Sequence, residues 1–155
     1  MAKKYDMPIL YSCHPRSRNR LAASGFQLDP RIIQHEPLGF HDYNCLQMNA
    51  FAVVSDSGTL PEESSFFTSV GHPFPAICIR TSTERPEAID KGDFIIAGID
   101  EKSLLQAVDT AVELCRDGQH GIPVPDYVDE NVSTKVVKIV QSYVGIVNKM
   151  VWRKF

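Results

Sequence analysis

The segment 55–63, which reads Ser-Asp-Ser-Gly-Thr-Leu-Pro-Glu-Glu, combines hydroxyl, glycine and carboxylate residues in an order that suits an anionic ligand. It follows an apolar run, 51–55, that predicts a β-strand, and it leads into a predicted helix, 61–68. Backbone N–H groups at the start of a helix bind phosphate well, and Gly58 would let a ligand approach the backbone closely. The pattern therefore predicts a phosphate site between a strand and a helix, with Ser57 and Gly58 at its centre.

The same residues also suit the capping of a helix that binds nothing. Thr59 and Glu62 have the spacing of a capping box, so we assign Glu62 to the cap. Glu63 is then left over, because one cap does not need two carboxylates. Its carboxylate either interacts favourably with the positive, N-terminal end of the helix dipole or accepts hydrogen bonds from a ribose diol. The position of Glu63 alone does not decide between these two roles.

A second polar segment, 80–87, follows another apolar run, 76–80. An arginine beyond the carboxyl end of a strand can neutralise a pyrophosphate through charge-assisted hydrogen bonds. The commoner fate of such a residue is a surface ion pair, here of Arg85 with Glu84 or Glu87. The pattern by itself favours the ion pair.

Two further segments hold weaker candidates. In 37–43 an aromatic side chain could stack on a base, but Phe40 or Tyr43 at helical spacing is more often part of a core. His14 stands at the end of the first predicted strand, which makes it a candidate site residue.

Several classes of function are disfavoured by what the sequence does not contain. The histidines and the four cysteines have no metal-ligand spacing, so we expect no structural metal, and no dinucleotide or P-loop motif indicates a bound cofactor. The formal net charge of -3 argues against nucleic-acid binding. The absence of a bilayer-length apolar run and of a secretory signal predicts a cytoplasmic protein away from the membrane, with buried free thiols.

The elements that must position these residues alternate between strand and helix. Apolar runs at 8–13, 31–35, 51–55, 76–80 and 94–98 predict strands, and helical patterns lie between them and at 101–116. Such alternation predicts an α/β, Rossmann-like fold, in which a parallel sheet carries helices on both faces. Ligands bind at the carboxyl ends of strands in such sheets, which is where the candidate residues fall.

The C-terminal region has a different character. We expect a domain at 1–118, a linker rich in Gly, Pro and Asp at 119–130, and a helical tail at 131–155. The tail has more apolar residues than one helix on one domain can bury, which indicates a partner surface. We expect a homodimer through this tail, with Gly145 as a bend within it.

The two polar segments resemble motifs of the non-hydrolysing UDP-N-acetylglucosamine 2-epimerases. Ser55-Asp56-Ser57-Gly58 with Glu62-Glu63 is similar to D-S-G-G-x-x-E-E, and Arg80-Thr81-Ser82-Thr83-Glu84-Arg85-Pro86-Glu87 is similar to R-x-x-T-E-R-P-E. The resemblance covers about residues 8–116, and it is strongest to the branch that makes UDP-N-acetyl-L-fucosamine. It departs at Thr59, which replaces the second glycine, and at His14-Pro15-Arg16-Ser17, where the family has H-x-N-P.

The resemblance implies the C-terminal half of a glycosyltransferase-B-like two-domain fold, with UDP or a UDP-N-acetylhexosamine as ligand. It implies that Ser57 and Gly58 bind the pyrophosphate, that Arg85 contacts a phosphate and that Glu63 binds the ribose. It also places Tyr43 and Leu38 at the uridine and His14 in the cleft.

The family's reaction eliminates UDP across C1–C2 of the sugar and adds it back on the other face. The resemblance assigns the carboxylates for this chemistry to an N-terminal Rossmann domain, so we expect this chain alone to be inactive, as half of an epimerase in surface polysaccharide precursor synthesis. A stand-alone UDP-sugar-binding module remains an alternative, whereas the T-E-R-P-E string argues against a glycosyltransferase.

Overall fold

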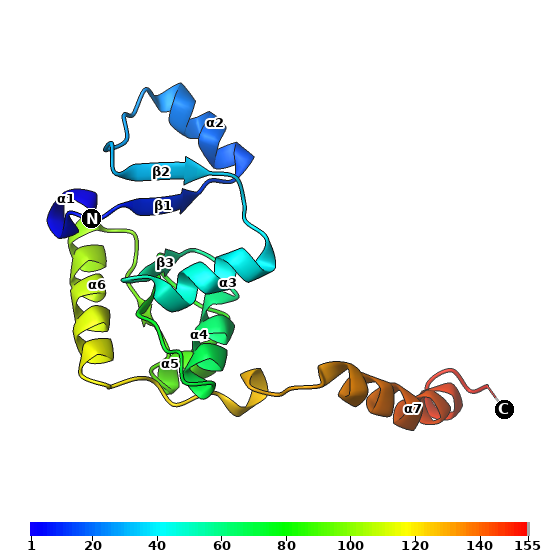
Figure 1. The fold of residues 1–155 in the computed structure, drawn as a ribbon. Coiled ribbons are helices and arrows are strands. Elements are labelled where there is room, and N and C mark those ends of the chain that lie inside the picture. Colours follow the sequence, from blue (N-terminus) through cyan, green and yellow to red (C-terminus); the bar gives the residue numbers. More distant parts are fainter. Residues whose placement is uncertain (155) are drawn as a thin grey trace.

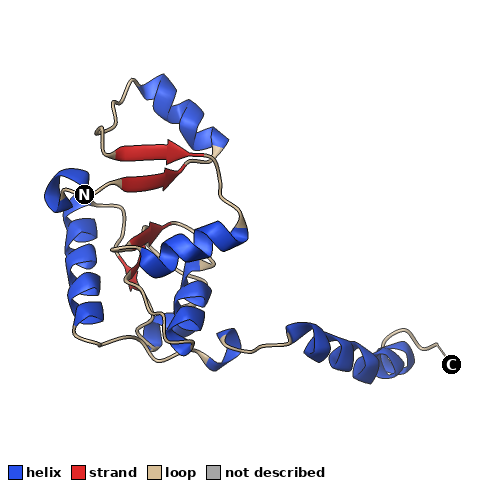
Figure 2. Cartoon of the chain, in the orientation of Figure 1, coloured by secondary structure: helices blue, strands red, loops and turns tan. Residues whose placement is uncertain are grey.

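The computed structural model describes residues 1–154, which alternate between short strands and helices as the sequence predicts (Figures 1 and 2). Gly25 follows the second helix in a left-handed conformation, and Asp100 caps the sixth by accepting a bond from the Ser103 N–H. The elements are α1 (Ala2–Tyr5), β1 (Ile9–Ser12), α2 (Pro15–Ser24), β2 (Ile32–His35), α3 (Phe40–Asn49), β3 (Val53–Ser55), α4 (Leu60–Ser69), β4 (Ala76–Cys78), α5 (Pro86–Asp90), β5 (Ile95–Ile96), α6 (Glu101–Arg116), η1 (Pro125–Tyr127) and α7 (Val132–Met150).

The strands are all parallel, but their hydrogen bonds form two ladders. β1 pairs with β2, with Ile9 opposite Ile32, and β3, β4 and β5 form a separate sheet in that order. The predicted α/β class, with parallel strands flanked by helices, is confirmed, but the expected burial of both faces does not hold for the β1–β2 pair. Leu10 and Ile33 are each 49% exposed, because a short apolar run does not show whether helices cover both sides of it.

The core lies on the two faces of the β3–β4–β5 sheet. Side chains alternate along each strand, so Ala76 and Cys78 of β4 face one cluster and Ile77 faces the other. Residues of α4 and α5 complete the first cluster, and residues of α6 with Tyr5 of α1 complete the second. Ile77 is fully buried, which contributes roughly 1.5–3 kcal/mol to folding. This sheet is the rigid support of the two polar segments.

All four cysteines are free thiols, as expected, but they are not all buried. Cys13 and Cys78 are buried, whereas Cys45 is exposed on α3 and Cys115 is partly exposed. Burial raises the pKa of the Cys78 thiol. Cys45 lies in an apolar stretch of the sequence, but the one buried residue of α3 is Gln47. An apolar neighbourhood in sequence therefore did not indicate burial of this thiol.

The predicted linker lies on the domain. The Val124 N–H donates to Oγ of Ser65 over 2.7 Å, and Tyr127 packs against the first core cluster. The division of the chain at residues 118 and 130 stays a prediction.

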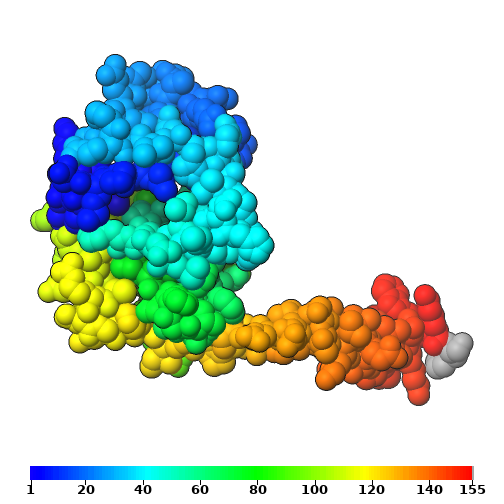
Figure 3. Space-filling view, in the orientation of Figure 1, coloured from blue at the N-terminus to red at the C-terminus, as the bar shows by residue number. Residues whose placement is uncertain are grey.

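α7 leaves the domain as an extended arm (Figures 1 and 3). It continues through Gly145 without interruption. Its apolar side chains are open to solvent, with Val137 at 67% exposure and Met150 at 72%. Among the described residues, no helix has the length and apolar character needed to cross a bilayer.

Candidate functional site

The loop between β3 and α4 is shaped by its own hydroxyl groups. The Ser57 N–H donates to Oγ of Ser55 over 3.0 Å, the Thr59 N–H donates to Oγ of Ser57 over 3.2 Å, and the hydroxyls of Ser57 and Thr59 lie 2.9 Å apart. Within residues 1–154, the Gly58 N–H donates no hydrogen bond. The loop thus presents a free backbone donor just before a helix, which is an arrangement that binds anions.

Glu62 does not form the expected capping box. Thr59 is the residue before α4, but its backbone is helical (φ −87°, ψ −14°) and its side chain makes no cap bond. Side-chain caps form from an extended backbone, so this conformation directs the hydroxyl elsewhere. Thr59 Oγ1 instead donates to Oε1 of Glu63 over 2.7 Å, one turn further along.

Glu63 is held in place from a second element, α3. Nε2 of Gln47 donates to Oε2 of Glu63 over 2.6 Å and to the Tyr43 hydroxyl over 3.1 Å. Gln47 is buried, with 2% of its surface exposed. Burial, and then the nearby Glu63 carboxylate, raise the pKa of Tyr43 to about 12. A carboxylate offers about four acceptor positions, so Glu63 keeps capacity for a diol.

Gln47 was missed by the sequence analysis. Its only signal in the sequence is that it is a polar residue one helical turn after Tyr43.

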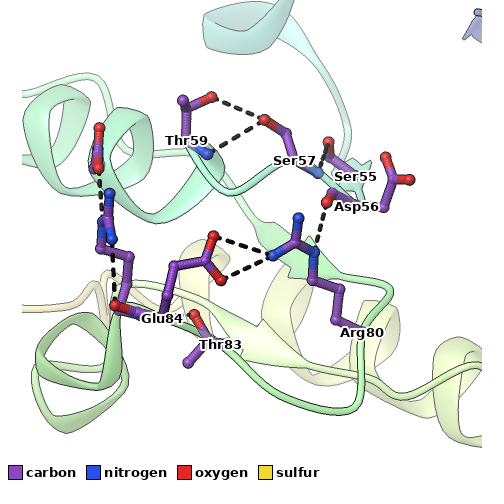
Figure 4. Close-up of polar contacts among 9 residues, drawn as sticks. Ser55, Asp56, Ser57, Thr59, Arg80, Thr83 and Glu84 are labelled. Atoms are coloured by element: carbon purple, nitrogen blue, oxygen red, sulfur yellow. Dashed lines mark hydrogen bonds and ion pairs between the residues drawn. The ribbon is translucent and has the colours of Figure 1, made fainter.

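Arg80 joins the two polar segments (Figure 4). Its Nε donates to the Asp56 carbonyl over 2.6 Å, and its Nη1 donates to both carboxylate oxygens of Glu84, at 2.9 and 3.2 Å. A Cβ added to Gly58 would lie 2.5 Å from Oε1 of Glu84 and 3.9 Å from Nη1 of Arg80. Gly58 is therefore the point where the loop after β3 meets the side chains that follow β4.

Arg85 forms an ion pair, but with neither of the two expected partners. Its Nε donates to Oε1 of Glu62 over 2.7 Å, whereas Glu84 pairs with Arg80 and Glu87 accepts a bond from Tyr127. The expectation was wrong because it considered only neighbours in sequence, and the fold brings the start of α4 beside the segment after β4. This contact also explains why Glu62 is not a cap.

His14 and Leu38 lie outside this network. His14 precedes α2, where its Nδ1 accepts a bond from the Arg16 N–H over 3.3 Å, and it is exposed. Leu38 is 39% exposed in the loop before α3. In the described part of the chain, no hydrogen bond or ion pair joins either residue to the loop after β3. The structure thus brings together Tyr43, Ser57, Gly58, Glu63 and Arg85, and it leaves the other two candidates apart.

The network lies on an open surface. The larger hollow of the chain, about 620 Å³, is lined by Lys4 and residues of α6 with Asp100, and a smaller one of about 50 Å³ lies around Asp93. Neither includes Ser57, Gly58 or Arg85. The described residues hold no group of three or more His, Cys, Asp or Glu that could bind a metal ion. The candidate phosphate site therefore lies outside both of these hollows.

Comparison with known proteins identifies the family. A family model described as UDP-N-acetylglucosamine 2-epimerase matches residues 1–141. The chain belongs to this family. Its relatives include the UDP-N-acetylglucosamine 2-epimerase of Methanococcus maripaludis, which is 32% identical over 113 residues; the match covers 70% of this chain and 30% of that relative. The chain thus corresponds to about a third of the length of such relatives.

Solved structures of the family have the same fold. UDP-N-acetylglucosamine 2-epimerase from Rickettsia bellii matches 99% of this chain and 41% of its own, with a TM-score of 0.85 and 39% identity. The Methanocaldococcus jannaschii UDP-GlcNAc 2-epimerase, solved in complex with UDP-GlcNAc and UDP, matches 92% of this chain and 37% of its own, with a TM-score of 0.73 and 25% identity. Epimerases of this family thus share the α/β arrangement described above.

Proposed function

We propose that this chain is the UDP-binding half of a UDP-N-acetylhexosamine 2-epimerase. The observation that supports this most is that Ser57 is hydrogen-bonded through Thr59 to Glu63, while Arg85 pairs with Glu62 at the start of the same helix. Together with the Gly58 N–H, these groups match the charge pattern of a nucleoside diphosphate. A free amide and a guanidinium suit the pyrophosphate, and a carboxylate suits the ribose diol. The family match and the related structure solved with UDP point to the same ligand.

Each part of the ligand has a proposed contact. Ser57, the Gly58 N–H and Arg85 bind the pyrophosphate, and Glu63 binds the ribose. Tyr43 lines the uridine pocket, since its hydroxyl accepts a bond from the same Gln47 that holds Glu63. Leu38 contacts the uracil through its backbone, and His14 faces the cleft. These last two assignments rest on the resemblance of the motifs alone.

The proposed reaction eliminates UDP across C1–C2 of the sugar and adds it back on the other face. Charge that develops on the leaving UDP is stabilised by Arg85 and the Gly58 N–H. Removal and return of the C2 proton needs positioned acids and bases, which we assign to a second, N-terminal α/β domain. This chain alone should then bind UDP weakly and leave the C2 proton in place.

Binding tests the first part of this proposal. Titration calorimetry of the chain should show weak UDP binding that is tighter than ADP binding, since the phosphates are shared and only the base differs. Equal affinity for ADP and UDP would refute the uridine assignment.

Activity tests the division of labour. In deuterium oxide, the isolated chain should not introduce deuterium at C2 of UDP-N-acetylglucosamine, followed by proton NMR. Incorporation above a buffer control would show that this chain carries its own base.

We further place the sugar in the UDP-N-acetyl-L-fucosamine branch, with a role in surface polysaccharide precursors. The support is the sequence around Gly58-Thr59-Leu60-Pro61 and the string Cys13-His14-Pro15-Arg16. Competition of a panel of UDP-hexosamines against UDP tests it, and the expected result is preference for the fucosamine configuration over the glucosamine one.

The apolar arm α7 supports a homodimer. Val140, Tyr143 and Val147 follow one another at helical spacing, and each is exposed. Exposed apolar surface of this extent seldom stays uncovered, so we propose that two copies pair through their arms.

A further inference from the structure

A carboxylate lies close to Gly58, beside the loop that the proposed function assigns to a phosphate. Oε1 of Glu84 is the nearest atom to the space beyond Gly58, and both Glu84 oxygens accept bonds from Nη1 of Arg80. Glu84 and a phosphate carry the same sign of charge and use the same acceptor geometry toward a guanidinium. They cannot both sit on Arg80 beside Gly58 without strong repulsion.

We propose that Glu84 is an internal competitor for the ligand's phosphate groups, and that Arg80 is a phosphate-binding residue that becomes free when Glu84 moves away. Glu84 holds the Arg80 guanidinium, and a pyrophosphate takes its place on Nη1. This inference rests on the proposed function, because it takes the loop at Gly58 as the phosphate site.

The contacts of Arg80 allow this exchange. Its Nε bond to the Asp56 carbonyl does not involve Glu84, so the guanidinium keeps its position beside the loop after the carboxylate leaves. Figure 4 shows Arg80 between the two segments, with Asp56 on one side and Glu84 on the other. The arginine is thus already oriented for a ligand before the ligand arrives.

Glu84 is also free to move. Its side chain is 53% exposed, and it belongs to the irregular segment between β4 and α5. Its carboxylate has no side-chain hydrogen-bond partner other than Arg80 among the described residues. Exposed ion pairs of this kind are weak, so the competition should reduce phosphate affinity only about two- to five-fold.

The test is calorimetric titration of the whole chain and its Glu84→Gln variant with UDP, inorganic pyrophosphate and uridine. Glu84→Gln should bind UDP and pyrophosphate about two- to five-fold more tightly and uridine with unchanged affinity. Glu87→Gln is the matched control, because Glu87 lies three residues after Glu84 and carries the same charge. Its side chain contacts Tyr127 and not Arg80. It should give a clearly smaller change.

The double variant Arg80→Gln/Glu84→Gln separates the mechanism from a general charge effect. In the Arg80→Gln background, the gain from Glu84→Gln should disappear. Weaker UDP binding by Glu84→Gln, a gain no larger than that of Glu87→Gln, or an equal gain for uridine would overturn the inference. If ADP binds as well as UDP while Glu84→Gln still tightens pyrophosphate binding, the uridine assignment fails and the role of Glu84 stands.

Discussion

Replacement of Arg85 by alanine should separate ligand binding from folding. Arg85 and its partner Glu62 form an ion pair over 2.7 Å, but their side chains are 35% and 37% exposed. Solvent screens such a pair, so its loss should change the melting temperature little. The proposed bond from Arg85 to a phosphate is charge-assisted, and the loss of such a bond reduces affinity by about 10- to 150-fold.

The measurement combines UDP titration calorimetry with thermal melting followed by circular dichroism. Arg85→Lys is the informative control, since lysine keeps the charge but loses the planar pair of donors, and its affinity should fall between those of the wild type and Arg85→Ala. If Arg85→Ala binds UDP within two-fold of the wild type while still folded, then Arg85 is only the partner of Glu62 and the assigned role is wrong.

The remaining predictions concern stability and assembly. Burial raises the pKa of Asp93, so the folded state binds a proton more tightly than the unfolded state and stability falls as pH rises above the ordinary carboxyl value of 3.8. Asp93→Asn should raise the urea midpoint at pH 7 and flatten this dependence, and a variant less stable than the wild type at pH 7 would contradict it. Gly121→Ala should destabilise the chain by roughly 1–3 kcal/mol in urea unfolding, because a Cβ there would lie 2.7 Å from the backbone of Asp93; an unchanged midpoint would refute this. Truncation after Tyr127 should convert a dimer into a folded monomer by light scattering, and a monomeric full chain would exclude pairing through α7.

The sequence was most informative where one element carries its own signal. The bounds predicted for α6 match the structure, because this helix has a wide apolar stripe, an Asp100 cap and a following Gly118. The strands were also found, since short apolar runs bounded by turns indicate β-structure. The split into two ladders was not predicted. Whether β1 and β3 pair depends on tertiary geometry, which the sequence of neither strand contains.

The candidate site shows the same limit. Motif resemblance selected Ser57, Gly58, Glu63 and Arg85; in the structure Ser57 is bonded through Thr59 to Glu63, and Arg85 pairs with Glu62 on the same helix, but their role in binding stays a prediction. Local patterns failed for Glu62, whose partner Arg85 lies 23 residues away, and for Gln47, which reaches Glu63 across 16 residues. Spacing rules describe contacts within one helix or turn, so they do not detect a polar contact between elements.

The central claim is that the loop after β3 and the segment after β4 form one diphosphate site, and amide NMR of the chain during UDP titration tests it most directly. The largest shifts should fall on the amides of Ser57, Gly58 and Thr59 and on the side-chain Nε–H groups of Arg80 and Arg85. Amides of α7, which is distant from this loop, should stay unchanged at low protein concentration. Shifts confined to the hollow lined by Lys4 and Asp109, with the Gly58 amide unmoved, would contradict the account.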